Sequence, residues 1–449
     1  MLVDYDLVIV GGTLVGRWAA LRAALRGARV VLVEPPGQVE QQIRTAIFRT
    51  ALGQRGAARS VTEQGAAMPS LVSNSDLPPA LTLAGLATNG VDVVLGQPRF
   101  CAVQPLQLTV GTRCLTARSG LLALAGVPCD APRPDRLVGP RYSPGDFLEK
   151  PVPTRVVLTG QQAAAVEWAA ALVQQMATVV LLSDRLLPTE DRDIQRLVGV
   201  QLRAMGVRLG PAALAKPADP VLLTPVLPTP VLPTPVLLTD VAPPPLAPLG
   251  LPGRLGPGPL TVNPYLRTSV PGVYAIGSLL GGENRPGLAQ AEAAIAVDNA
   301  LFWPRRRVRY DRMHYSLTAL TPVGRAGLTE QQARQYYAQV VCYQSGAAAA
   351  GITYGVDFCK LVVADRRLVG VHLMGTAAAG AIALLAPYLG QPFSKFAQGF
   401  SHLSGLADTQ GLTLQIAQAL AQHQDSQWQP GHWRRDWAEN WFNWRRSRG

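Results

Sequence analysis

The hydrophobic residues at the start of the chain change their spacing in a regular order. Residues 6–10 form a continuous apolar run, as in a buried parallel strand, and an alanine-rich stretch with helical spacing follows. After Gly27, a second apolar run ends at Glu34. The order strand, helix, strand predicts a βαβ unit at the beginning of the chain.

The turn between the first strand and the helix carries a glycine pattern, with Gly11, Gly12 and Gly16 around Thr13. Such a turn lets the backbone approach a diphosphate and directs the N–H groups and the positive dipole end of the helix toward it. Glu34 follows at the distance where a carboxylate accepts hydrogen bonds from an adenosine ribose. We predict dinucleotide binding here; an α/β unit that only keeps this shape is the alternative. Thr13 departs from the pattern, since its Cβ would crowd the diphosphate.

A second βαβ pattern begins near the middle of the chain. Residues 155–158 predict a strand, residues 163–176 a helix, and residues 178–182 a second strand, with Gly160 in the turn and Asp184 after the last strand. Two nucleotide-binding folds imply two nucleotides. This is the architecture of a flavoprotein that takes hydride from a nicotinamide.

The composition changes abruptly over residues 212–248, which are rich in Pro, Leu, Val and Thr. Closely spaced prolines remove backbone donors and enforce an extended conformation. We interpret this segment as a surface loop or edge segment; a proline-rich docking ligand is the alternative. From residue 311 the pattern becomes rich in strands and then helical, which predicts a third, α+β domain.

Length and charge limit the class of protein. A chain of 449 residues corresponds to about three domains. The formal net charge of +12 favours acidic partners or anionic lipid, whereas the scattered arginines argue against nucleic acid. Because we find no run near the roughly 18–20 apolar residues of a membrane span and no apolar leader, we expect a cytoplasmic protein.

The cysteines and histidines suggest no metal site. The five cysteines form no C-x-x-C or C-x-x-x-x-C pair and the five histidines are scattered. We therefore expect ordinary buried thiols of a reducing compartment and no bound metal.

Several segments resemble the pyridine nucleotide-disulfide oxidoreductases, the group of dihydrolipoamide dehydrogenase, glutathione reductase and mercuric reductase. They occur in the order that this family shows: the N-terminal unit, residues 265–277, residues 287–292, residues 321–330 and residues 359–375. The resemblance implies two Rossmann-like domains, for FAD and NAD(P), and a C-terminal α+β dimerisation domain. The implied boundaries are 1–150 and 251–308 for the FAD domain, 151–250 for the NAD(P)-like domain, 309–426 for the dimerisation domain, and 427–449 for a tail.

The resemblance also assigns cofactor-binding residues. For FAD these are Gly11, Gly12, Thr13, Gly16, Glu34, Gly126, Gly277, Ser278, Leu288 and Ala289. Ser278 stands where the family has an aspartate that binds the ribityl chain, and a hydroxyl accepts a weaker hydrogen bond than a carboxylate. For NAD or NADP the assigned residues are Gly160 and Asp184, but Gln162 replaces the glycine that lets the phosphate approach, so nicotinamide binding is doubtful.

The catalytic positions depart further from the family. The redox disulfide C-x-x-x-x-C has no counterpart, because residues 35–49 contain no cysteine, and thiol chemistry needs a thiolate near the flavin. Arg49 is the counterpart of a lysine near flavin N5, and Glu167 matches the acid that pairs with it or is a helix-surface carboxylate. His402 and Asp408 lie near the lost His-Pro-Thr-x-x-Glu motif, either as a displaced acid/base pair or with His402 as a capping or interface residue.

The tail carries Trp433, Trp437, Trp441 and Trp444 at spacings of four, four and three residues. In a helix these residues form one stripe, flanked by arginines. The stripe suits packing on the protein's own dimer, a groove on a larger assembly, or the headgroup level of an anionic membrane.

Two functions remain open at this point. The first is a homodimeric FAD-dependent oxidoreductase without dithiol chemistry that passes electrons from a nicotinamide or a redox protein to a small acceptor. The second is a catalytically degenerate structural or regulatory subunit of a larger, membrane-associated or soluble assembly, which docks through its tail.

Overall fold

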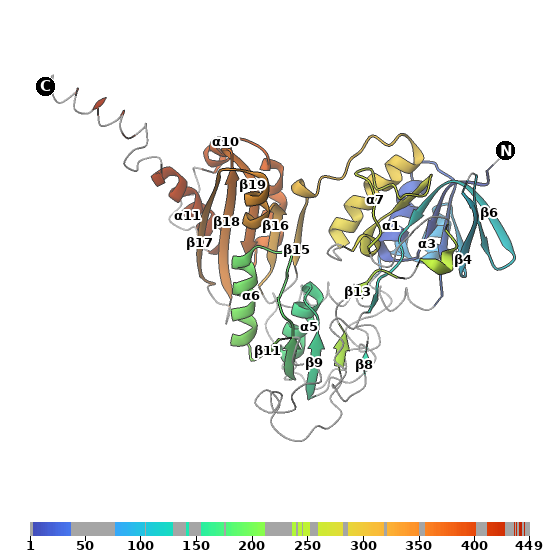
Figure 1. Ribbon diagram of the computed structural model, residues 1–449, viewed down its shortest axis with the longest axis horizontal. Coiled ribbons are helices and arrows are strands. Elements are labelled where there is room, and N and C mark those ends of the chain that lie inside the picture. Colours follow the sequence, from blue (N-terminus) through green and yellow to red (C-terminus); the bar gives the residue numbers. More distant parts are fainter. Residues whose placement is uncertain are drawn as a thin grey trace. The chain divides into compact units, whose positions relative to one another are not determined.

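The computed structural model divides into two compact units, the first comprising Met1–Thr189 and Leu202–Arg309 and the second Glu190–Gln201 and Tyr310–Gly449 (Figure 1). The residues that it describes are 3–36, 77–103, 105–128, 141–142, 154–174, 177–211, 236–238, 241–244, 246–251, 259–281, 286–317, 321–349, 355–400, 411–426, 435, 437, 440–441 and 444.

The first unit is built on a seven-stranded sheet. Its strand order is β3 (Val91–Leu95), β2 (Val30–Glu34), β1 (Tyr5–Val10), β6 (Arg113–Leu122), β5 (Leu106–Val110) and β4 (Pro98–Val103), and β14 (Val273–Ala275) pairs with β6. β3, β2, β1, β6 and β14 run parallel, whereas β5 and β4 join as antiparallel strands. The inner strands are apolar throughout because helices and loops cover both faces of a parallel sheet.

Two helices that are far apart in sequence lie side by side in this unit: α1 (Leu14–Ala24) and α7 (Pro286–Leu301). Figure 1 shows them next to the sheet, with α3 (Leu83–Thr88) nearby. The buried residues of α1 include the small Ala19, Ala20 and Ala23, all fully buried, and small residues let neighbouring elements approach closely.

A second parallel sheet contains the second βαβ unit. Its order is β11 (Arg208–Gly210), β10 (Thr178–Leu182), β9 (Arg155–Thr159), β12 (Val236–Leu238) and β8 (Arg141–Tyr142). The helix α5 (Ala163–Gln174) joins β9 to β10, as predicted. A separate small pair is formed by β7 (Val127–Pro128) and β13 (Val241–Ala242).

The interpretation of residues 212–248 as a loop or edge segment is wrong for Val236–Leu238. These residues form β12, which lies between β9 and β8 and is therefore an inner strand. The sequence Val-Leu-Leu carries the β-propensity for such a strand, but the neighbouring prolines dominate the composition. Residues 212–235 lie outside the described part of the chain.

The second unit contains an antiparallel sheet. Its order is β15 (His314–Leu317), β16 (Val323–Gly327), β19 (Arg367–Met374), β18 (Val356–Ala364) and β17 (Val340–Ala348). The helices of the unit are α8 (Glu330–Tyr336), α9 (Ala378–Leu385), α10 (Phe393–Gly399), α11 (Gly411–Ser426) and most of α6 (Arg192–Ala204). A core of apolar residues from β18, β19, α9, α10 and α11 fills the space between the sheet and the helices α9, α10 and α11.

The predicted fold class is therefore confirmed: two parallel α/β sheets are followed by a C-terminal α+β region. The finer domain boundaries stay a prediction. The apolar runs of residues 91–100 and 106–117 are each divided between two strands, because turns at Gly96 and Gly111, both with positive φ, interrupt them. Residues 38–59, which are rich in Gln and Arg with helical spacing, lie outside the described residues.

The described residues of the tail support a helical stripe. Trp437, Trp441 and Trp444 are helical, and their rings stack with centroid distances of 5.9 and 5.0 Å. All three are exposed. Trp433 lies outside the described residues, so its place in the stripe stays a prediction.

Candidate functional site

The segments assigned to the first nucleotide meet at one edge of the seven-stranded sheet. Val10, Leu122 and Ala275 are paired in register at the carboxyl ends of β1, β6 and β14. The glycine turn, the segment after β6 and the Gly277–Leu280 turn begin directly beyond them. Ligands of open parallel sheets bind outside the carboxyl ends of the strands. The edge is therefore the candidate site of unit 1.

The glycine turn has no room for side chains at three positions. A Cβ on Gly11, which has φ +118°, would lie 2.4 Å from the carbonyl oxygen of Ala123, and a Cβ on Gly16 would lie 2.1 Å from the carbonyl oxygen of Gly11. A Cβ on Gly12 would lie 2.1 Å from Oε2 of Glu34. At Gly11 and Gly16 the close atoms are backbone, so these positions exclude any other residue type, whereas a side chain at Gly12 would displace the Glu34 carboxylate. The turn is thus a tight backbone surface.

Thr13 is the N-cap of α1. Its Oγ1 accepts a hydrogen bond from the N–H of Gly16 (3.1 Å) and donates one to the carbonyl oxygen of Ala123 (2.9 Å). The hydroxyl thereby satisfies one of the free N–H groups of the helix N-terminus. Thr13 does not cap the N–H groups of Leu14 and Val15, so these two donors of the first turn can bind a phosphate.

Glu34 is held by Arg17, which lies in the first turn of α1. Nη2 of Arg17 is 3.0 Å from both carboxylate oxygens of Glu34, while Nε donates to the carbonyl oxygen of Gly12 (3.0 Å) and Nη1 to that of Leu81 (3.3 Å). Both side chains are nearly buried. Burial raises the pKa of Glu34, and the adjacent guanidinium opposes that rise. Arg17 thus fixes the direction of the carboxylate and favours its charged form.

A carboxylate has about four lone-pair positions, and the contact with Arg17 occupies two of them. Two positions remain for the hydroxyls of a ribose. Glu34 therefore fits the predicted role at the end of β2.

The turn that follows β14, with Gly277 and Ser278, is tied to the same edge by hydrogen bonds. Oγ of Ser278 donates to the carbonyl oxygen of Leu124 (3.0 Å), and the N–H of Gly277 donates to Oε2 of Glu292 (2.8 Å). Gly277 has φ +70°, and a Cβ there would lie 3.8 Å from Cβ of Ala289 on α7. Leu288, which precedes Ala289, is half-buried. Gly126, in the segment that follows β6, is buried. Ser278 keeps lone pairs that can accept a hydrogen bond from a polyol.

The turn of the second βαβ unit is arranged differently. Gly160 has φ +154°, and its N–H donates to the carbonyl oxygen of Leu182 (3.3 Å). The N–H of Leu187 donates to the carbonyl oxygen of Gln161 (2.7 Å), so the loop after β10 folds back onto the turn. Leu187 is fully buried at a positive φ, whereas Asp184 is exposed. The loop after β10 therefore covers part of the turn where a nicotinamide dinucleotide would bind.

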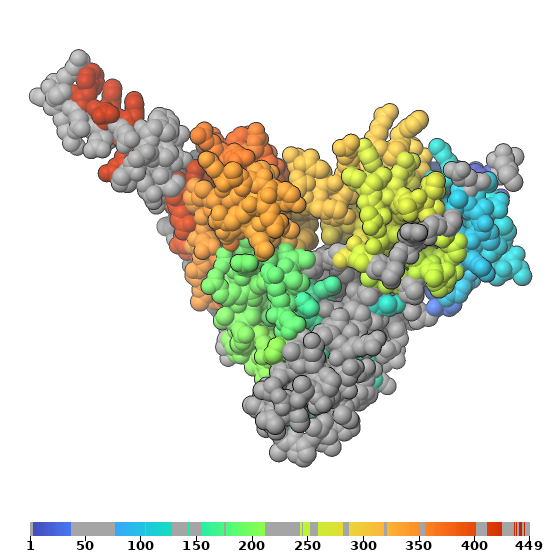
Figure 2. Space-filling view, in the orientation of Figure 1, coloured from blue at the N-terminus to red at the C-terminus, as the bar shows by residue number. Residues whose placement is uncertain are grey.

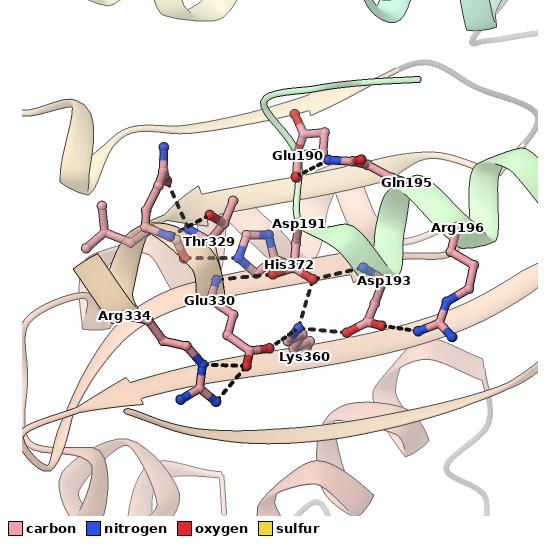
Figure 3. A network of polar contacts seen from close by, with 12 residues as sticks. Glu190, Asp191, Asp193, Gln195, Arg196, Thr329, Glu330, Arg334, Lys360 and His372 are labelled. Carbon is pink, nitrogen blue, oxygen red and sulfur yellow. Dashed lines mark hydrogen bonds and ion pairs between the residues drawn. The ribbon is translucent and has the colours of Figure 1, made fainter. Parts of the chain in front are cut away.

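A buried lysine in the second unit forms the densest group of ion pairs in Figure 3. Nζ of Lys360, on β18, lies 2.8 Å from Asp191, 2.7 Å from Asp193 and 2.7 Å from Glu330. Lys360 and Asp191 are each 2% exposed at their side chains. Burial lowers the pKa of Lys360, but its hydrogen bonds to the three carboxylates raise it by more, so the ammonium stays charged. The cluster fastens α6 and the start of α8 to the antiparallel sheet.

His372 on β19 lies at the back of this cluster. Its Nε2 is 3.0 Å from the carbonyl oxygen of Leu328, and the ring is fully buried. Burial lowers the pKa of His372 to about 4, although the charge of Asp191 opposes that change. The imidazole is therefore neutral at pH 7, with Nε2–H as the donor to Leu328.

Comparison with known proteins supports the interpretation of this fold. The family model described as pyridine nucleotide-disulphide oxidoreductase matches residues 5–219. Trypanothione reductase of Trypanosoma congolense is 30% identical over 125 residues, which are 26% of this chain and 25% of that protein. Dihydrolipoyl dehydrogenase of Acholeplasma laidlawii is 26% identical over 344 residues, which are 70% of this chain and 99% of that protein.

The solved structures agree over nearly the whole chain. The HOCl-induced flavoprotein disulfide reductase RclA of Escherichia coli superposes with a TM-score of 0.68 at 18% identity, covering 93% of this chain and 99% of that chain. The chain thus resembles the pyridine nucleotide-disulphide oxidoreductases in the sequence of residues 5–219 and shares the fold of a flavoprotein disulfide reductase. The alignment with the trypanothione reductase covers only a quarter of that relative.

The catalytic positions that the resemblance assigns are only partly described. Arg49 and His402 lie outside the described residues, and so does Asp408, so their roles stay predictions. The alternative that Glu167 is a surface carboxylate is wrong, because its side chain is buried on α5 (5% exposed). A carboxylate is rarely buried unless it is paired, which suits the predicted acid of an ion pair better than a solvated residue.

The expectation of buried thiols is wrong for two cysteines. Cys101 on β4 and Cys114 near the start of β6 are exposed, whereas Cys359 is fully buried. Among the described residues, no group of His, Cys, Asp and Glu is placed to hold a metal ion. In the same part of the chain, no helix is long and apolar enough to cross a membrane.

Two residues of the site were not predicted from the sequence. Arg17 was a possible candidate, because a charged residue in the first turn of an apolar helix needs a partner when it is buried. Glu292 lies within the matched segment 287–292, and its burial shows that it is the internal acceptor for Gly277. Neither pairing follows from spacing in sequence alone, since each depends on how separate elements meet.

Proposed function

We propose that unit 1 binds FAD and that the chain is an oxidoreductase-like flavoprotein that does not use dithiol/disulfide chemistry. The observation that carries the proposal is the carboxylate of Glu34, which Arg17 holds over the glycine turn at the sheet edge. The second assigned segment, with Ser278, begins at the same edge. Similarity to the pyridine nucleotide-disulphide oxidoreductases supports FAD as the dinucleotide.

The residues present would hold the dinucleotide in a definite way. Glu34 would accept hydrogen bonds from the adenosine ribose, and the N–H groups of Leu14 and Val15 would face the diphosphate at the positive end of α1. Ser278 would accept a hydrogen bond from the ribityl chain. A bound flavin would supply a centre that accepts hydride or single electrons, while the protein supplies position and electrostatics.

Dithiol exchange does not belong to the proposal, because the sequence has no cysteine before Cys101 and no C-x-x-x-x-C pair. Electrons would pass instead to a small acceptor or a redox protein. Nicotinamide as the electron donor has weaker support, since Gln162 occupies a glycine position and the loop at Leu187 folds onto the turn. We also propose a homodimer, in keeping with the α+β C-terminal region.

A second candidate function is a structural or regulatory subunit of a larger assembly. It is favoured by the loss of the His-Pro-Thr-x-x-Glu sequence and of the redox cysteines. The exposed rings of Trp437, Trp441 and Trp444 would then dock on a partner protein or at an anionic membrane, since a solvent-exposed aromatic stripe of this size is a typical contact surface.

The flavin content of Glu34→Ala tests the proposal. We expect the variant to retain much less flavin than the wild-type protein, because the ribose loses its acceptor and Arg17 loses its partner. The matched control is Asp92→Asn, which removes the negative charge that pairs with Arg113 at the other end of the same sheet. Equal flavin content in Glu34→Ala and the control, with both proteins folded, would contradict the ribose contact.

A further inference from the structure

Three large apolar side chains are exposed near the ends of α1 and α7. Leu25 follows α1 directly and is 71% exposed, while Phe302 and Trp303 follow α7 and are 58% and 73% exposed. Because α1 and α7 lie side by side, and because Asp298 near the end of α7 is bonded to α1, these residues belong to one region of unit 1. We call this region the aromatic-basic patch.

The same region concentrates positive charge. Asp298 is shared by three guanidinium groups: Arg26, Arg22 (3.6 Å) and Arg306 (2.5 Å). One carboxylate balances one of these charges, so two remain. Arg305 is exposed beside Trp303 and adds a third. The pKa of Arg26 is lowered, first by burial and then by the charges of Arg22 and Arg306, which shows how closely the cations are placed.

The sequence around the patch offers no further acid. Residues 22–29 and 299–307 contain arginines and neutral residues only, and of these arginines Arg29 is paired with Asp6 (3.7 Å). A second copy of this chain, which carries a net charge of +12, is therefore a poor occupant, whereas an anionic surface is complementary. Figure 2 shows α7 and the segment after it, yellow to light orange, at the surface of the first unit.

We propose that the aromatic-basic patch binds an anionic lipid surface. Trp, Phe and Leu side chains beside arginines are the combination that inserts at the boundary of headgroups and acyl chains. The side chains enter a fluid layer, so no preformed groove is required, and each arginine near the surface adds attraction to anionic lipid. The proposal concerns a surface outside the candidate dinucleotide site and does not depend on flavin binding.

Flotation of the full-length protein with lipid vesicles tests the proposal. We expect binding to phosphatidylcholine vesicles that contain phosphatidylglycerol and much weaker binding to phosphatidylcholine alone. The double substitution Phe302→Ser with Trp303→Ser should lower the partition coefficient by about tenfold or more, since two large apolar side chains no longer insert. Arg305→Gln should lower it by roughly fivefold, as expected from about 1 kcal/mol per arginine.

Matched controls use equally exposed residues elsewhere. Leu384→Ser changes an apolar residue of α9 that is 74% exposed, and Arg203→Gln removes an exposed arginine of α6. Both variants should float as the wild-type protein does. Circular dichroism spectra identify any variant that fails to fold. If the double variant does not fold, the milder Arg305→Gln tests the proposal in its place.

Three results would overturn the proposal. The first is that the wild-type protein does not float with vesicles. If it binds polyglutamate and the patch variants lose that binding, the patch would have an acidic protein partner and not a lipid surface. The second is equal binding to vesicles with and without phosphatidylglycerol. The third is unchanged binding of the patch variants together with lost binding when Trp437, Trp441 and Trp444 are all replaced by serine, which would place the contact in the tail.

Discussion

Replacement of the buried lysine at position 360 should strongly destabilise the second unit. Nζ of Lys360 lies 2.7 to 2.8 Å from the three carboxylates of Asp191, Asp193 and Glu330. In Lys360→Met the apolar chain still fills the space, but the carboxylates lose their cation. Asp191 is the decisive partner because its side chain is only 2% exposed.

The magnitude follows from this burial. Removing one partner of a buried ion pair costs about 3 to 5 kcal/mol, because the other charge stays buried without compensation. Asp193 and Glu330 are 19% and 30% exposed, so water screens their contributions to roughly 0 to 1 kcal/mol each. If the free energy of unfolding decreases by about 2 kcal/mol per molar urea, the urea concentration at the midpoint of unfolding should fall by about 2 M.

A urea titration followed by circular dichroism measures this shift, and hydrogen exchange of the β18 amides assigns it to the second unit. Lys395→Met is the matched control, since Lys395 is exposed on α10, and its midpoint should hardly change. The double variant Lys360→Met with Asp191→Asn should recover part of the loss, because no charged Asp191 is left buried. A midpoint of Lys360→Met equal to that of the control would refute the reasoning.

Three further predictions concern protonation and backbone packing. Arg17→Met should raise the pKa of Glu34 further, because the guanidinium that favours the carboxylate is lost. When the pH is lowered, the variant should therefore lose flavin affinity, measured by fluorescence titration, at a higher pH than the wild-type protein does. Identical pH profiles would count against the Arg17 contact. His372, whose pKa is lowered to about 4, stays neutral in the fold while the unfolded chain binds a proton, so stability should fall by about 3 kcal/mol from pH 6.5 to 4, and urea titrations of His372→Gln should lack that decline; an equal decline in both proteins would contradict this. Gly16→Ala should prevent stable flavin binding, because its Cβ would lie 2.1 Å from the carbonyl oxygen of Gly11; a visible spectrum like that of the wild-type protein would exclude the close approach.

The architecture was predictable where the local pattern and the burial agree. The apolar runs of β1, β2, β9 and β10 are buried strands of parallel sheets, so their sequences are apolar along their whole length. Residues 236–238 were not predicted as an inner strand, because three residues among prolines carry little periodicity and the pairing with β9 is a long-range contact. The inclusion of most of α6 in the second unit also depends on long-range contacts, through Lys360.

The candidate site was predictable as a set of positions but not as a set of contacts. The glycine spacing and Glu34 marked the turn and the acid. The partner of that acid, Arg17, became visible only when α1 was placed beside the end of β2. Likewise, Thr13 was expected to crowd a diphosphate, and its hydroxyl caps the helix and bonds to Ala123; whether it crowds the ligand stays a prediction.

The visible absorption spectrum of the purified full-length protein, recorded before and after incubation with FAD and removal of the unbound cofactor, tests the central claim most directly. We predict flavin absorption in a near-stoichiometric amount, lost in Glu34→Ala and retained in Asp92→Asn. A folded wild-type protein that shows no flavin absorption either before or after incubation would contradict flavin binding at the sheet edge with Gly11 and Glu34. The structural or regulatory subunit would then be the favoured function.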